Sequence, residues 1–452
     1  MRFATGFFFL FITGFLAGQE PPAGTQQTEP PSPPEYSGPA ILSRGGGPLP
    51  GGSTELLRLR PYASVTTVYD TGLTGIFTDT QGRLPAGDAV GAQVSFGAIG
   101  YHTWKRTELG MTYHGALRHY SRQTYYDGLE QELGLNLTHR VTRRVAITLN
   151  EAAASRQRGY YGMAGGQYYS DSFNALAENM LFDTRTFLLS STARVTFQKS
   201  HRLSFSMSGT GALMEPRSRA LSGVRSAQAQ GDIAYRLSRE QTIAGDYSYL
   251  HLNYPGAFGS ADIHGTAVVY SRQLSRRWEL GLAFGGYRVE TLRLQRVAID
   301  PVIAAIIGQG TGVEAFHRIT YIPRADVRFS YRFRASSLAA RYERGLAPGN
   351  GLYLTSSSES AGLEYSYTGL RRLHFAASGG NSRYSSLAQT IGRLRTYRAG
   401  AGMTYKLSGP LSLVARIDGR RFNIRGAGFE RTYYRASVGV AFSPGDVPLA
   451  LW

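Results

Sequence analysis

Residues 203–213 read LSFSMSGTGAL, and this stretch shows the pattern that decides the fold. The odd positions carry Leu203, Phe205, Met207 and Leu213, whereas serine occupies positions 204, 206 and 208. Successive side chains of a β-strand point to opposite faces of the sheet. The stretch therefore predicts a strand with one apolar face and one polar face.

The same alternation recurs from Leu56 to Phe442, broken by connections of two kinds. Short basic or polar turns, such as residues 104–106, 142–144 and 199–201, alternate with longer segments rich in Gly, Tyr, Ser, Asp or Pro. This spacing predicts an all-β fold: a single transmembrane antiparallel β-barrel of about 18 strands (about 16–18), with short periplasmic turns and longer external loops.

A soluble β-sandwich also alternates, and two features favour the membrane barrel over it. The expected strands run to about 10–14 residues, longer than the ~5–6 typical of soluble sheets. Aromatic residues also lie close to the turns, where an interfacial girdle would be: Trp104, Phe197, Tyr235, Tyr270, Trp278, Tyr331, Tyr367 and Tyr405.

The composition agrees with such a fold. The 452 residues include 55 glycines, 29 tyrosines and no cysteine, and the formal net charge is +18. No stretch after the N-terminus holds the ~18 continuous apolar residues of a spanning helix, which argues against helical membrane topology. The basic residues are spread along strands and not gathered in tracts, which disfavours a nucleic-acid partner.

The N-terminus predicts export. Arg2 precedes an apolar run from Phe7 to Leu16 and a small-residue end, which together are typical of a signal peptide. We expect a signal peptide at 1–18, a Pro-rich disordered linker at 19–53, the barrel at 54–443 and a C-terminal tail at 444–452.

The last expected strand ends in the aromatic Phe442, close to the terminal Trp452. In this feature and in architecture the chain resembles bacterial outer-membrane β-barrel proteins of the porin type, with no narrower family indicated. The resemblance implies a Gram-negative outer-membrane location. It also implies contact with outer-membrane lipid and lipopolysaccharide, the barrel-assembly machinery as a partner, and a homo-oligomer as one option.

If the polar face points inward, the lumen is rich in arginine. The most concentrated row is Arg318, Arg324, Arg328 and Arg332, with Asp326 among them, and further pore-lining candidates are Arg341, Arg398, Arg416, Arg431 and Arg435. Such a lumen favours anions in a water-filled pore. The alternative is that Arg–carboxylate networks only hold the barrel wall together.

Two connections are candidates for constricting the pore. The segment 292–316 contains an apolar run with Val302, Ile303, Ile306 and Ile307, and the segment 158–183 is rich in glycine and tyrosine. An apolar segment in an external loop either folds into the pore mouth or packs on the rim or against another copy.

Catalysis is not expected. His119 with Asp127, or His264 with Asp262, could form a rim dyad, but no nucleophile turn and no metal-spaced histidine pair accompanies them. We expect no enzyme, cofactor or metal. The leading hypothesis is a channel for small polar or anionic solutes. The alternatives are a non-conducting surface or adhesion barrel with a plugged lumen, and an export conduit for an acidic polysaccharide.

Overall fold

The structure is a computed structural model that describes residues 56–74, 86–121, 126–156, 182, 184–257, 259–275, 277–298, 310–387, 392–426, 429–444 and 447–450. Within these residues no helix has the length and apolar character required to cross a membrane. The loop residues Val302, Ile303, Ile306 and Ile307 lie outside the described residues.

Long antiparallel strands make up almost all of the described chain. Their bounds are β1 Leu56–Thr74, β2 Ala86–Thr103, β3 Thr107–Tyr120, β4 Gly128–Arg140, β5 Val145–Arg156, β6 Thr186–Gln198, β7 Leu203–Pro216, β8 Val224–Arg236, β9 Gln241–Tyr254, β10 Gly259–Gln273, β11 Trp278–Ala298, β12 Thr311–Arg332, β13 Ser336–Ala347, β14 Ser356–Tyr367, β15 Leu373–Ser386, β16 Arg393–Ser408, β17 Leu411–Arg425, β18 Phe429–Phe442 and β19 Val447–Ala450.

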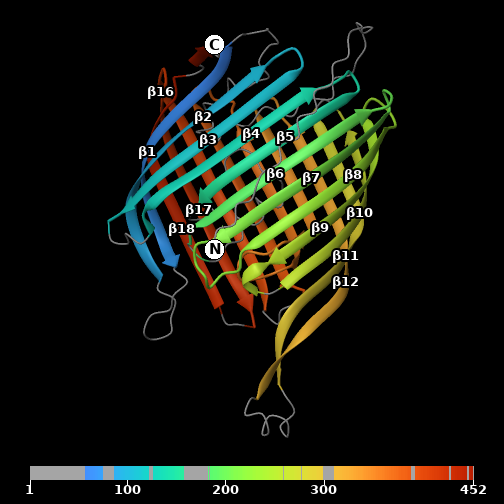
Figure 1. Cartoon of the computed structure of the whole chain (residues 1–452). Helices are drawn as coiled ribbons and strands as arrows, with labels where there is room; N and C mark the ends of the chain where they lie inside the picture. Colours follow the sequence, from blue (N-terminus) through green and yellow to red (C-terminus); the bar gives the residue numbers. More distant parts are fainter. Residues whose placement is uncertain are drawn as a thin grey trace. The chain divides into compact units, whose positions relative to one another are not determined.

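The sheet closes on itself at β1. Each strand from β2 to β18 pairs with its neighbours in the sequence, and β1 pairs with both β2 and β18. The short strand β19 pairs with Leu56–Leu59, beyond the stretch Ala63–Asp70 that β18 occupies, so β18 and β19 share one position in the ring. The result is a closed barrel of 18 strands, as the sequence predicts, with β2 to β9 (blue to green) forming one wall in Figure 1.

The outer face of the barrel is apolar. Large hydrophobic side chains are exposed on strands around the ring, including Val65, Val94, Leu117, Met207, Ile233, Val268, Phe284, Leu363, Ile417 and Val438. Apolar rows of this extent would be costly in water and are stable against lipid, where a closed sheet leaves no edge unpaired. The chain is thus a closed β-barrel whose outer face suits a membrane.

The connections alternate as predicted, with two exceptions. On the periplasmic side β16 ends at Ser408 and β17 begins at Leu411. On the external side β9 to β10 and β17 to β18 are joined by similarly short segments, 255–258 and 426–428. Pairing between β12 and β13 stops at Ala325 and Arg344, whereas β12 continues beside β11 past the neighbouring strands (Figure 1).

Candidate functional site: the arginine-lined lumen

The predicted arginine row on β12 lies on the lumen face of the wall. On this strand the odd positions include the exposed Ile319 and Tyr321 of the lipid face, whereas Ile322, next to Tyr321, is buried. Arg318, Arg324, Arg328 and Arg332 share the even face with Ile322.

One member of this row reaches across the wall to β9. The Nη1 atom of Arg324 lies 2.7 Å from Oδ2 of Asp246, whose side chain is only 5% exposed. The strand register places Asp246, Ala267, Gly285 and Arg324 in one transverse row. Because Ala267 and Gly285 are small, the two charged side chains can meet above them.

The next residues of the row are also held by carboxylates. Arg328 donates to both oxygens of Asp326, at 3.0 and 3.1 Å. Arg341 on β13 lies 2.9 Å from Glu343 and 3.7 Å from Asp326. Among the described residues, the side chains of Arg318 and Arg332 have no hydrogen bond or ion pair. The positive charge of Arg324 and Arg328, in the middle of the row, is therefore mostly neutralised.

A second bank of arginines lines the wall where the barrel closes. Strands β16 to β18 bring five arginines to the lumen face, and Asp418 is the one carboxylate that these three strands place there: Arg398, Arg416, Arg420, Arg431 and Arg435. Arg416 donates to both oxygens of Asp418, at 2.6 and 3.0 Å. Arg398 lies directly opposite Arg420 on the neighbouring strand, so two like charges face one another.

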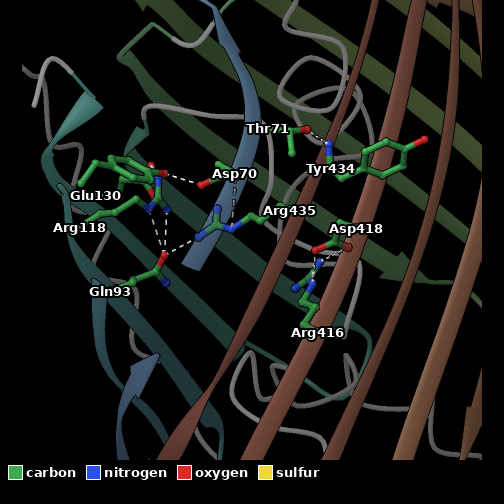
Figure 2. Close-up of polar contacts among 10 residues, drawn as sticks. Asp70, Thr71, Gln93, Arg118, Glu130, Arg416, Asp418, Tyr434 and Arg435 are labelled. Carbon is green, nitrogen blue, oxygen red and sulfur yellow. Dashed lines mark hydrogen bonds and ion pairs between the residues drawn. The ribbon is translucent and has the colours of Figure 1, made fainter. Parts of the chain in front are cut away.

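Polar contacts tie this bank to β1, β2 and β3. Figure 2 shows Arg118 and Arg435 converging on Gln93, whose Oε1 accepts hydrogen bonds at 3.0 and 2.6 Å. Arg435 also lies 3.9 Å from the fully buried Asp70, and Arg118 lies 3.3 Å from Glu130. The contacts of Arg435 cross the seam between the first and last full strands and stabilise the closure, and Arg118 extends them to β3 and β4.

Arg431 serves the same seam in another way. Its Nε and Nη2 atoms donate to the carbonyl oxygen of Gly72, at 3.1 and 2.5 Å, and its guanidinium lies 4.8 Å from the centre of the Tyr433 ring. Gly72 has a φ of 64°, a conformation that glycine adopts without strain. Arg431 and Arg435 are thus buried, and both bind groups on the other side of the seam.

The external connection 348–355 is buried, which the sequence analysis did not predict. Gly349 and Gly351 have positive φ values of 115° and 88°, and the Asn350 side chain accepts from the backbone N–H groups of Leu352 and Tyr353. These local features form a tight turn that carries Tyr353 and Leu354 into the barrel. There Tyr353 is 1% exposed and Leu354 6% exposed.

Three contacts fasten this segment, which we call the mouth loop (residues 348–355), to other parts of the ring. The Ser222 N–H donates to the carbonyl of Gly351 at 2.9 Å, from the connection between β7 and β8. The Tyr254 hydroxyl donates to the carbonyl of Pro348, and the Tyr353 hydroxyl donates to the carbonyl of Gly392, each at 2.5 Å. The mouth loop therefore contacts the β7–β8 connection and the end of β9 on one side and the β15–β16 connection on the other.

The mouth loop joins two apolar clusters at the external end of the lumen. Leu354 packs in the cluster that includes Leu252, Val289 and Ile322. Tyr353 packs in the cluster that includes Leu394, Phe422 and Tyr433, against which Phe182 also packs. Burial raises the pKa of Tyr353 to about 12, so its hydroxyl remains a donor at neutral pH. The mouth loop thus adds buried apolar side chains at the external end of the barrel.

The rim dyads have different outcomes. His119 and Asp127 do meet, with Nδ1 2.6 Å from Oδ2, but no serine hydroxyl contacts this histidine among the described residues. Asp262 instead accepts from His251 and Tyr249, while His264 contacts Tyr247. No group of metal-ligating side chains occurs within the described part of the chain.

Comparisons with known proteins give the following. No family model matches the chain, and no curated protein matches it. Among solved structures, a BenF-like porin from Pseudomonas fluorescens Pf-5 is 12% identical with a TM-score of 0.44, covering 88% of this chain and 100% of its own. Pseudomonas aeruginosa OccK5 (OpdH) is 13% identical with a TM-score of 0.42, covering 88% and 100%. Acinetobacter baumannii OccAB3 is 8% identical with a TM-score of 0.40, covering 86% and 99%. The fold of this chain follows from the strand pairing described above.

Proposed function

We propose that this chain is an outer-membrane channel that passes small polar solutes and favours anions. An 18-strand barrel is too wide for wall side chains alone to fill, which supports an aqueous path along the lumen. The observation that carries the proposal is the bank on β16 to β18, where five arginines face the lumen and Asp418 is the one carboxylate that these three strands add to that face: Arg398, Arg416, Arg420, Arg431 and Arg435.

The direct opposition of Arg398 and Arg420 supports the preference for anions. Like charges directly opposite on neighbouring strands repel one another, and an anion between them relieves that repulsion. Guanidinium groups also bind carboxylates and phosphates in a bidentate geometry, through two parallel hydrogen bonds. Solutes that carry such groups are the class this bank fits best.

The row on β12 supports a different role from the one its sequence suggests. Arg324 and Arg328 are matched by Asp246 and Asp326, so these pairs stabilise the wall and add little net positive field. Arg332 is the member whose charge faces the lumen without a carboxylate among the described residues, whereas Arg318 lies on the part of β12 that extends past its pairing with β13.

A second function is supported by the mouth loop. Because Tyr353 and Leu354 are buried in two clusters from different walls, the external end of the lumen could be closed to ions, as in a surface barrel with a plugged lumen. Purified protein in a planar bilayer separates the two functions. Stepwise conductance with an anion-selective reversal potential supports the channel, and an ion-tight barrel supports the plugged alternative.

A further inference from the structure

The lipid-facing side of β15, β16 and β17 changes character towards its external end. On β17 the outward positions Leu411, Leu413 and Ile417 are followed by Arg421 and Arg425. Equivalent changes occur on β15, where Phe375 is followed by Arg383, and on β16, where Tyr397 is followed by Arg395 and Arg393. The wall thus passes from an apolar band to a belt of arginines.

The height of this change matches the outer boundary of the membrane. At about 3.3 Å per residue, the distance from Leu411 to Arg421 is about 33 Å along the strand. A tilt of about 40° reduces it to about 25 Å along the membrane normal, which is the usual height of the apolar band. The exposed Tyr397 and Tyr434 lie just inside the boundary, where interfacial aromatic residues are expected. The arginines therefore lie at the level of outer-leaflet headgroups.

Four of these arginines form two cross-strand pairs. Arg383 on β15 lies directly opposite Arg395 on β16. Arg393 on β16 lies directly opposite Arg425 on β17. Because Arg393 and Arg395 are on the same face of one strand, the two pairs are adjacent. We call these four residues the outer arginine patch.

Few carboxylates neutralise the positive charge of the outer arginine patch. Arg383 contacts Glu359 at 3.2 Å, and among the described residues the side chains of Arg393, Arg395 and Arg425 have no hydrogen bond or ion pair. The nearby Arg421 is matched by Glu430 at 2.6 Å. Like charges in direct register destabilise a sheet unless a counter-ion lies between them. An anion from outside the chain would relieve this repulsion.

The outward face of β9 to β12 at the same external level is built differently. There Asp262 accepts from His251, and Glu290 accepts from Arg288 and His317. Acidic and basic groups are balanced on that face. The excess of positive charge is therefore a property of one side of the barrel and not of the external boundary as a whole.

We propose that the outer arginine patch binds the phosphate groups of a phosphorylated lipid of the outer leaflet. Guanidinium groups bind phosphate through two parallel hydrogen bonds, and their position above the apolar band allows the lipid chains to lie against Leu411, Leu413 and Ile417. The patch is on the opposite side of the wall from the lumen, so this site is separate from the solute path and independent of the proposed channel function.

The test uses the full barrel purified in detergent and a fluorescent lipid A carrying two phosphates. The variant Arg383→Gln/Arg393→Gln/Arg395→Gln/Arg425→Gln should bind this lipid at least about tenfold more weakly than the parent, since basic groups near a membrane surface each add appreciable affinity for anionic lipid. The matched control is Arg288→Gln, an outward arginine at the same level that Glu290 already neutralises, and its affinity should stay within about twofold.

Two further arms identify the ligand. Lipid A without its phosphates should bind the parent protein as weakly as phosphorylated lipid A binds the quadruple variant, and millimolar inorganic phosphate should compete poorly because it lacks the apolar contacts. Retention of parental affinity by a variant that still migrates as a folded barrel would overturn the proposal. Equal binding of the dephosphorylated lipid would overturn the assignment to phosphate, and effective competition by free phosphate would overturn the assignment to lipid.

Discussion

Arg324 of β12 and Asp246 of β9 form an ion pair across two intervening strands, with 2.7 Å between Nη1 and Oδ2. Ala267 and Gly285 occupy the places between them in the same transverse row. The Tyr287 ring lies 5.6 Å from the Arg324 guanidinium and flanks the pair. The charge of Arg324, which the sequence suggests for the solute path, is therefore paired within the barrel wall.

Replacing Arg324 by glutamine should destabilise the barrel. Asp246 would be left as a buried carboxylate without its cation, a loss on the order of 2–3 kcal/mol after allowing for the partial exposure of Arg324. The urea concentration at the unfolding midpoint in lipid vesicles measures the effect. The double variant Arg324→Gln/Asp246→Asn should recover most of the loss, whereas equal destabilisation in both would show that the pair is not its source.

Gly285 should tolerate no side chain. A Cβ at this position would lie 1.9 Å from the carbonyl oxygen of Thr266, inside the sheet. Gly285→Ala should therefore lower the unfolding midpoint or block insertion, as judged by heat-modified migration on gels. Gly211→Ala is the matched control, because a Cβ there would have no atom within 4 Å and should change nothing.

Neutralising the opposed pair Arg398 and Arg420 should reduce anion preference. Arg398→Gln/Arg420→Gln should lower the anion-to-cation permeability ratio by at least about threefold, since each charge contributes on the order of 1 kcal/mol to an ion at contact in water. Arg421→Gln is the control: it lies on β17 but faces outward, so the net charge changes while the lumen does not. Equal shifts in both variants would point to a general charge effect and not to the lumen.

The mouth loop should limit conductance. Tyr353→Phe removes the hydrogen bond to the Gly392 carbonyl, worth about 1 kcal/mol, so loop opening should become about fivefold more frequent. Replacing residues 349–354 by a short Gly-Ser link should raise the single-channel conductance several-fold. Unchanged current in the shortened variant would show that the constriction lies elsewhere.

The same contact has a definite pH dependence. The Tyr353 hydroxyl donates a hydrogen bond to the carbonyl oxygen of Gly392. Burial raises the pKa of Tyr353 to about 12. The contact should therefore be complete below pH 10 and be lost as pH rises through about 12. Channel noise measured from pH 7 to 11 should show no opening transition in the parent. A transition near pH 10, the ordinary pKa of tyrosine, would contradict the buried position.

The sequence was enough to predict the barrel and the face on which each side chain lies. The reason is that period-2 alternation indicates which residues of a strand share a face. It could not show that Arg324 meets Asp246, since that contact depends on the register of four strands and on small residues between the partners. It also left open how the β12 arginines divide between solute path and wall, because partners such as Asp246 lie far away in sequence.

The sequence of the mouth loop contains a pattern that indicates its burial. Residues 348–354 read PGNGLYL, a turn followed by apolar residues in an external connection. The reasoning that selected Val302, Ile303, Ile306 and Ile307 applies equally to this segment. Those four residues lie outside the described part of the chain, and their role as a constriction stays a prediction.

The central claim is that ions cross this barrel along an arginine-lined lumen. Its most direct test is the reversal potential of the purified protein in a planar bilayer under a tenfold KCl gradient. The account predicts discrete conductance steps and a reversal potential displaced towards that of chloride. A bilayer that stays ion-tight, or a potential displaced towards that of potassium, would contradict it.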